Sequence, residues 1–148
     1  QNLGLQHIAE LSTLRRLDLT WNYRLTDEDV KHLRNLPRLV ELDLGGTGFT
    51  GAGLVYVKDI ESLEILKIGG NRISDADIVQ LKSLNQLRQL GLGGNPITDA
   101  GLRNLTEFPR LERVDLRHTK VSQSGVNQLQ RMMPGLTITA GGEYRGKQ

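Results

Sequence analysis

A period of about 24 residues runs through the chain and constrains its fold more than any other feature. Leucines mark the period at intervals of 25, 24, 24 and 24 residues: Leu14, Leu39, Leu63, Leu87 and Leu111. A period of this length is typical of a solenoid, in which each repeat forms one coil and buries its apolar side against its neighbours. We therefore expect a single α/β domain with one continuous core.

Within each repeat, the residue types predict a strand, a turn and a short helix. Apolar residues alternate with period two, as at Leu42 and Leu44, which predicts a strand whose leucines point into the core. An asparagine or threonine follows, such as Asn95, and we expect it to hydrogen-bond the backbone of the turn. The next hydroxyl residue should cap the helix, and Ser74 with Asp77 comes close to a capping box.

The full pattern, LxxLxLxx(N/T)x(I/F/V)(T/S)DxGLxxLxxL, resembles the leucine-rich repeat family. More narrowly, it resembles the 24-residue "TDxGL" type of bacterial repeat proteins, which is similar to the repeats of F-box substrate adaptors but lacks their cysteine. The resemblance covers about residues 1 to 138. It implies a right-handed solenoid shaped as a horseshoe arc, with a parallel β-sheet on the concave side and short helices on the convex side. It also implies that the chain binds protein partners.

The repeats define the domain boundaries that we expect. Residues 1–138 should form the repeat domain and residues 140–148 a flexible tail. The predicted parts are a partial N-terminal repeat or cap at 1–11, repeats at about 12–36, 37–60, 61–84, 85–108 and 109–133, and a C-terminal strand at 134–139. Because the chain opens on the helical half of a repeat and lacks an initiator methionine, we expect a truncated N-terminus.

Composition narrows the classes of function. Lys and Arg number 19 and Asp and Glu 17, so the net charge is only +2 and nucleic acid is not an expected partner. The chain has no cysteine, which excludes disulfides and thiolate metal sites. No apolar run approaches the roughly 18 residues that span a bilayer. The N-terminus also lacks the features of a signal peptide. We expect no membrane partner, and the compartment stays open.

Several motifs resemble cofactor-binding or metal-binding sites, but each also has a structural explanation. Residues 46–51 read GTGFTG, a literal GxGxxG, but the same slots elsewhere read GGNRIS and GGNPIT, so these glycines belong to the repeat. No two histidines have metal-ligand spacing. Acids at the helix starts, such as Asp27, Asp75 and Asp99, resemble a calcium ladder, but they also stabilise the positive end of a helix dipole. We therefore expect no cofactor, no metal and no catalytic residue.

The outward-facing positions of the predicted strands form the candidate binding surface. Side chains before, within and after the LxL stretch should line the concave sheet, where solenoids bind partners. The middle of one edge is glycine, and larger side chains lie only toward its ends. The expected partner-binding residues are Arg16, Asp18, Trp21, Asp43, Ile65, Lys67, Arg113, Asp115, Arg117 and His118.

Each part of this surface also has a purely structural interpretation. The glycines either let a partner's backbone approach closely or only allow a tight strand-to-turn geometry. The first repeat has a one-residue insertion in its WNYR turn. Trp21 is either an exposed interface anchor or packs on this insertion and the N-terminal cap. Ile65 is a single apolar residue that should project from a central strand into solvent. The charged corner either binds a partner or is a solvated face: Arg113, Asp115, Arg117 and His118.

Together these features favour a non-enzymatic protein–protein interaction module that binds a protein on its concave face, as a monomer or with weak self-association. One alternative is an architectural or spacer segment of a longer repeat array. Another is one part of a multidomain protein whose activity, such as that of a ligase or kinase, lies outside this chain. Binding of a small ligand or glycan is weakly motivated, because a glycine trough lacks convergent polar groups.

Overall fold

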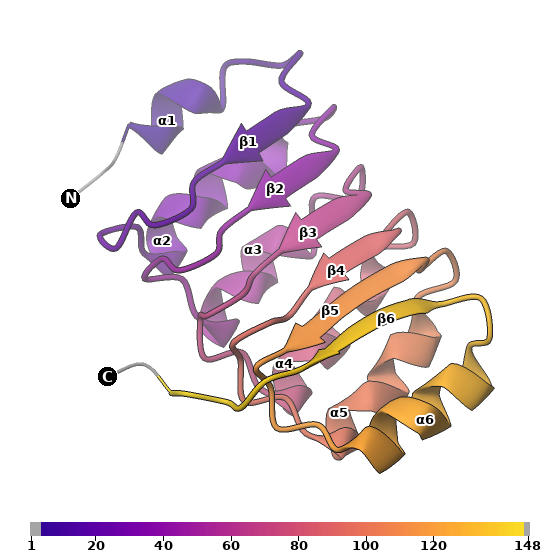
Figure 1. Ribbon diagram of the computed structural model, residues 1–148. Coiled ribbons are helices and arrows are strands. Elements are labelled where there is room, and N and C mark those ends of the chain that lie inside the picture. The colour runs from indigo at the N-terminus through magenta and orange to yellow at the C-terminus, as the bar shows by residue number, and fades with distance from the viewer. Residues whose placement is uncertain (1–3, 147–148) are drawn as a thin grey trace.

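The computed structural model describes residues 4–146 as a stack of coils (Figure 1). Within these residues, six strands pair in sequence order to form one open parallel sheet. Neighbouring strands are joined by segments that run behind the sheet, where the helices lie (Figure 1). The strands are β1 (Arg16–Asp18), β2 (Glu41–Asp43), β3 (Ile65–Lys67), β4 (Gln89–Gly91), β5 (Arg113–Arg117) and β6 (Thr137–Gly141).

The helices are short, as the sequence predicts. In three of the repeats one α-helical turn continues into a 3-10 helix, and in the second repeat the 3-10 helix comes first. No helix in the described part of the chain is long and apolar enough to cross a membrane. The α-helices are α1 (Leu5–Ile8), α2 (Asp27–Val30), α3 (Leu54–Val57), α4 (Asp75–Val79), α5 (Asp99–Leu102) and α6 (Gln123–Met132). The 3-10 helices are η1 (Lys31–Asn35), η2 (Gly51–Gly53), η3 (Gln80–Ser83) and η4 (Arg103–Glu107).

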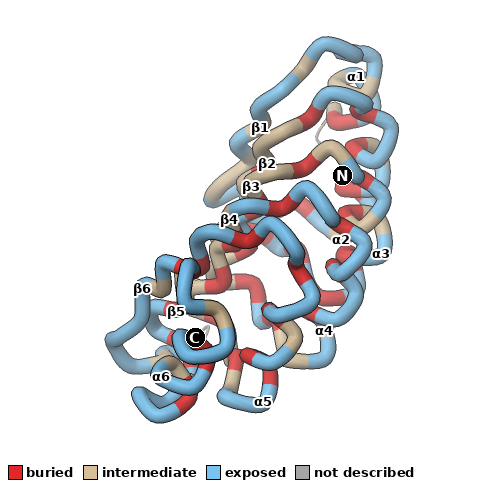
Figure 2. The backbone as a smooth tube through the Cα atoms, turned by 90° about the vertical axis from the view of Figure 1, so that its right-hand side faces the viewer, coloured by how far each residue is buried: buried red, intermediate tan, exposed pale blue. Residues whose placement is uncertain are grey.

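One leucine column runs through the core, as the repeat predicts. Leu17, Leu42, Leu66, Leu90 and Val114 are aligned in register across the first five strands. The three central leucines of this column are at most 1% exposed, and buried residues follow the interior of the stack (Figure 2). Burying one such side chain contributes about 1.5–3 kcal/mol, so stacking the coils supplies the main driving force for folding.

The asparagine and threonine slots hydrogen-bond the buried turns, which confirms the sequence interpretation. The side chain of Asn95 accepts from the backbone N–H of Asn71 at 2.9 Å and from that of Ile73 at 3.0 Å. Its amide group donates to the carbonyls of Ile68 and Leu92, both at 3.0 Å. The ladder therefore satisfies backbone groups that stacking removes from water.

Two helices are capped by a carboxylate from their own repeat. Asp29 accepts from the backbone N–H and the hydroxyl of Thr26, each at 2.9 Å. Asp77 accepts from the same two groups of Ser74, each at 2.8 Å. Both are capping boxes, as the sequence predicts.

In the other repeats, the capping carboxylate comes from the preceding repeat. Asp27 accepts from the backbone N–H of Thr50 at 2.7 Å and from its hydroxyl at 2.6 Å. Asp75 and Thr98, and Asp99 and Ser122, make the same two bonds. The sequence predicted only a favourable place on the helix dipole for these acids. The structure shows that they also join consecutive repeats through charge-assisted hydrogen bonds.

Glycines make room for these carboxylates. A Cβ atom at Gly101 would lie 2.2 Å from a carboxylate oxygen of Asp75, and Gly53 and Gly125 face Asp27 and Asp99 in the same way. Between the second and third repeats the order is reversed: Gly51 belongs to the preceding repeat, and its Cβ would lie 2.3 Å from the carboxyl carbon of Asp77. Each of these junctions therefore holds one carboxylate and one facing glycine.

The C-terminal strand differs from its predicted bounds. Strand β6 covers Thr137–Gly141 rather than 134–139, so the first two residues of the predicted flexible tail belong to the sheet. The reason is that β5 is longer than the other strands and pairs with Ala140 and Gly141 at its end. Farther along, the ring of Tyr144 lies 5.1 Å from the ammonium nitrogen of Lys120, which holds part of the tail against the last repeat.

Candidate binding surface

All ten predicted binding residues lie on the strands or within three residues of a strand's end, and those on the strands alternate with the inward-facing leucines. The strand register places the outward residues in two rows, so that residues from distant parts of the sequence become neighbours. The first row is Arg16, Glu41, Ile65, Gln89 and Arg113. The second row is Asp18, Asp43, Lys67, Gly91 and Asp115.

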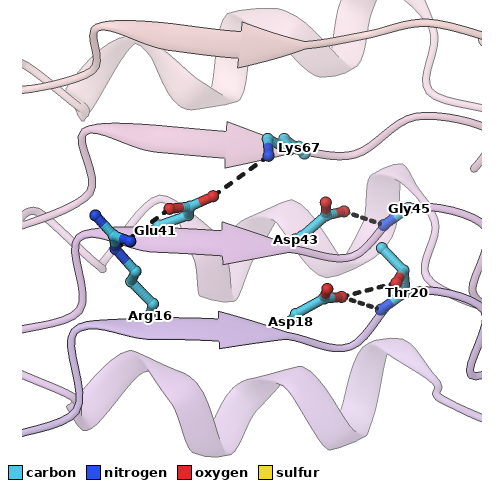
Figure 3. Close-up of polar contacts among 7 residues, drawn as sticks. All are labelled: Arg16, Asp18, Thr20, Glu41, Asp43, Gly45 and Lys67. Carbon is cyan, nitrogen blue, oxygen red and sulfur yellow. Dashed lines mark hydrogen bonds and ion pairs between the residues drawn. The ribbon is translucent and has the colours of Figure 1, made fainter.

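Glu41, in the first row, forms ion pairs with two neighbouring cations. It lies 3.6 Å from the guanidinium of Arg16 and 3.3 Å from the ammonium of Lys67 (Figure 3). Arg16 and Lys67 are exposed and Glu41 is half-buried, so each ion pair contributes at most about 1 kcal/mol to stability. Their clearer effect is on position, since they hold the charged end of Lys67 near Glu41. Ile65, in the same row, is half-buried.

Two carboxylates lie side by side at the N-terminal end of the second row. Asp18 accepts from the backbone N–H of Thr20 at 2.9 Å and from its hydroxyl at 2.7 Å, and these bonds lower the pKa of Asp18. Asp43 accepts from the backbone N–H of Gly45 at 3.0 Å (Figure 3). Burial raises the pKa of Asp43 above its ordinary value, despite this bond and the charge of Lys67.

A trough of about 1050 Å³ follows the ends of the strands, and its floor is largely glycine backbone. Hydrogen bonds continue the sheet beneath it, since Gly46 donates to Gly69 at 2.9 Å and Gly70 donates to Gly93 at 2.8 Å. Gly46, Gly70 and Gly94 have φ angles of 63°, 67° and 71°, which favour glycine. These three glycines therefore allow a turn that other residues rarely adopt, and they also leave the trough open.

Trp21 and Tyr23 form the wall at the N-terminal end of the trough. The ring of Trp21 lies across Gly46, where a Cβ atom would come within 2.7 Å of the ring. Trp21 is nevertheless 69% exposed and Tyr23 73% exposed, with 6.4 Å between their ring centroids. Trp21 therefore contacts Tyr23 of the WNYR turn and remains accessible. Sequence reasoning did not select Tyr23, although its place in the one-residue insertion was a usable signal.

At the C-terminal end of the trough, the structure brings the charged corner together and partly neutralises it. Arg117 lies 2.8 Å from Asp115, on the same strand. Burial raises the pKa of Asp115, but the hydrogen bonds and charge of Arg117 outweigh that effect and leave the pKa below its ordinary value. The ring of His118 lies against Gly142, where a Cβ atom would come within 2.3 Å of it. Arg72 also lines the trough and was not predicted.

Comparisons with known proteins agree with the fold of a leucine-rich repeat solenoid. A family model described as "Leucine Rich repeat" matches residues 10–33 and 83–105. The structure of an internalin (inlF) from Listeria monocytogenes aligns with a TM-score of 0.71 over 97% of this chain, at 23% identity. Internalin C2 (inlC2) from the same organism aligns with a TM-score of 0.68 over 91% of this chain, at 28% identity. This chain is a leucine-rich repeat solenoid.

The likeness concerns a limited part of each neighbour. The leucine-rich repeat chain spans 38% of the length of the inlF structure and 55% of that of inlC2. The plant peptide hormone receptor RGFR1 in complex with RGF2 aligns over 79% of this chain and 18% of its own, with a TM-score of 0.53 and 19% identity. No curated protein sequence matches the chain.

Among the described residues, 4–146, no group of metal-ligating side chains is placed to hold a metal ion.

Proposed function

We propose that this leucine-rich repeat domain is a non-enzymatic module that binds a protein partner on the outward face of its sheet. The observation that carries the proposal is the open trough, with a glycine floor and exposed aromatic rings at one end. Aromatic side chains are common anchors of protein interfaces, and a backbone floor lets a partner approach closely. The family supports this choice, since two structural neighbours are internalins and a third is a receptor in complex with RGF2.

The binding surface of the proposal is the predicted set of residues, which the register assembles into one face. Trp21 and the acidic pair form one end, Ile65 and Lys67 lie at the centre, and Arg113 and Arg117 lie at the other end. Charges of both signs are present along this face, so the partner is expected to offer a mixed polar surface rather than a uniform charge. This agrees with the low net charge of the chain, which disfavours nucleic acid.

A selection with matched surface variants tests the proposal. Peptides are selected from a displayed random library on the wild-type domain, and their affinities are then measured for two variants. The first is Trp21→Ala, Lys67→Glu, Arg117→Glu on the sheet face. The second is Tyr56→Ala, Lys82→Glu, Arg103→Glu on the helical side, which makes the same changes of charge and removes one aromatic ring. Circular dichroism checks that both variants fold.

We expect the sheet-face variant to lose at least tenfold in affinity for the selected peptides and the helix-face variant to stay within twofold of the wild type. Peptides that bind the sheet-face variant as tightly as the wild type would overturn the proposal. Peptides that are lost only from the helix-face variant would place the binding surface on the opposite side of the solenoid.

A second candidate, self-association through the N-terminal end, is favoured by one observation. Leu11 occupies the slot of Leu36 and Phe108, but it is 52% exposed whereas they are 1% exposed. Covering this leucine with a second copy would bury apolar surface, and β1 is an edge strand of the sheet formed by residues 4–146. Sedimentation over a range of concentrations tests this candidate: association should weaken in Leu11→Gln, and a wild type that stays monomeric throughout excludes it.

A further inference from the structure

We propose that the N-terminal end of the trough binds an arginine side chain on an extended peptide segment of the partner protein. The inference rests on the proposed sheet-face function and specifies the chemistry of one contact. Three features converge at this place: two carboxylates that form no ion pair within residues 4–146, an exposed tryptophan ring, and a floor of glycine backbone.

The carboxylates of Asp18 and Asp43 form no ion pair within the described part of the chain, although the charge of Lys67 acts to lower the pKa of both. They are direct neighbours in the register of β1 and β2, and adjacent strands lie only about 4.8 Å apart. Like charges at such positions are unfavourable. Neither aspartate forms an ion pair with any residue in the range 4–146, because the ammonium of Lys67 points to Glu41 instead (Figure 3).

The ring of Trp21 supplies a second contact beside these carboxylates. It lies across Gly46, and the adjacent Gly45 lies against Asp43, with 3.1 Å between its ideal Cβ position and a carboxylate oxygen. Trp21 and Asp43 both line the trough. A guanidinium is planar, so it stacks on an indole while its N–H groups donate in pairs to a carboxylate. Arginine satisfies both contacts, whereas a lysine ammonium lacks a face to stack.

The floor of the trough indicates that the arginine arrives on an extended chain. Beyond Gly46, the same slot is Gly70 and then Gly94, so no side chain rises from this slot until His118, although Lys67 and Arg72 line the trough from neighbouring positions. Trp21 and His118 are four strand spacings apart, which amounts to about 19 Å. An extended peptide advances about 3.3 Å per residue, so roughly six residues cross this distance. A segment of this length lies across the strands with its backbone on the glycines.

Fluorescence titration tests this contact directly, because Trp21 is the only tryptophan of the chain. The probe is a six-residue synthetic peptide with one arginine followed by glycines and serines. Its controls carry citrulline, a neutral isostere of arginine, or lysine at the same position. We expect the arginine peptide to quench Trp21 and to bind at least tenfold more tightly than the citrulline peptide, with the lysine peptide in between. Equal binding of the arginine and citrulline peptides, or of the arginine and lysine peptides, would overturn the assignment.

Variants separate this inference from the broader function. Asp18→Asn with Asp43→Asn should weaken the arginine peptide at least tenfold, while Asp59→Asn, which removes an exposed carboxylate just after helix α3, should leave its affinity unchanged. Retained affinity in the double variant refutes the arginine contact. If library-selected peptides still distinguish the sheet-face variant from the wild type, the proposed function stands although the arginine contact fails.

Discussion

Exchanging a carboxylate and a glycine between the second and third repeats tests how these coils are joined. At the Asp75–Gly101 junction, the acid lies in the preceding repeat and the glycine in the following one. At the Gly51–Asp77 junction the order is reversed. The double variant Gly51→Asp, Asp77→Gly converts the second arrangement into the first. We expect the carboxylate introduced at position 51, in the preceding repeat, to accept hydrogen bonds from the backbone N–H and the hydroxyl of Ser74.

Each single change should be harmful for its own reason. Asp77→Gly removes the acceptor of two hydrogen bonds from Ser74, both 2.8 Å long, and bonds to a charged group are worth about 1.5–3 kcal/mol. Gly51→Asp places a side chain 2.3 Å from the carboxyl carbon of Asp77, and overpacking costs about 1–3 kcal/mol. Taking about 2 kcal/mol for each, independent changes would cost about 4 kcal/mol in the double variant. We expect a cost below about 1 kcal/mol, since the exchange restores a junction found elsewhere in the chain.

Urea unfolding followed by circular dichroism measures these free energies, and thermal melts provide an independent measurement. Each single variant should lose about 4–8 °C in Tm, and the double variant less than about 4 °C. Ala52→Asp is the control, because it adds the same charge at an exposed position beside Gly51. A double variant that loses the sum of the two single losses would refute the idea that one carboxylate serves each junction.

Other predictions concern the ladder, the acidic pair and the trough floor. In urea unfolding, Asn95→Ala should lower the free energy of unfolding by about 3–5 kcal/mol, because two buried N–H groups lose their acceptor. Asn22→Ala, at the exposed end of the ladder, should lower it by less than about 1 kcal/mol. Burial raises the pKa of Asp43 above 3.8, so its neutral form stabilises the fold at low pH and that stability is lost as the pH rises through the folded-state pKa. Asp43→Asn should therefore raise Tm at pH 7 by at most about 2 °C, given its exposure, and an equal gain below pH 3.8 would contradict this reasoning. Gly46→Ala should lower the free energy of unfolding by about 1–3 kcal/mol and shift the fluorescence of Trp21, because φ at this residue is 63° and the indole ring lies within 2.7 Å of the new Cβ. An unchanged melt and emission spectrum would show that the ring does not lie across residue 46.

The sequence predicted the parts of the fold that each repeat determines by itself. Alternation at Leu42 and Leu44 assigns the strand and its inward face, and the spacing of Ser74 and Asp77 assigns a local cap. These features need only the chain within one repeat, where the geometry of strands and helices is known in advance. The leucine column then follows, because identical coils stack in identical register.

Contacts between repeats were harder to predict, because they depend on the offset between stacked loops. The hydrogen bond from Thr50 to Asp27 joins residues 23 positions apart, and only the structure shows that the two loops lie side by side. The end of β6 was missed for a similar reason, since it depends on the extra length of β5. At the site, the register placed the outward residues correctly, but the exposure of Trp21 depends on how the inserted turn folds around Tyr23.

One slot along the trough has a positive φ in all five repeats, but only the two ends of the trough carry a side chain there. Trp21 and His118 have φ angles of 62° and 57°, in the slot where the three central repeats have glycine. A side chain in this conformation costs about 1–2 kcal/mol relative to glycine, so folding alone would favour glycine in all five positions. Because the ring of Trp21 is largely exposed, packing within the chain repays little of that cost. The binding role that we propose would account for the strained tryptophan, since its ring forms an aromatic wall at one end of the trough and leaves the glycine floor open for a partner.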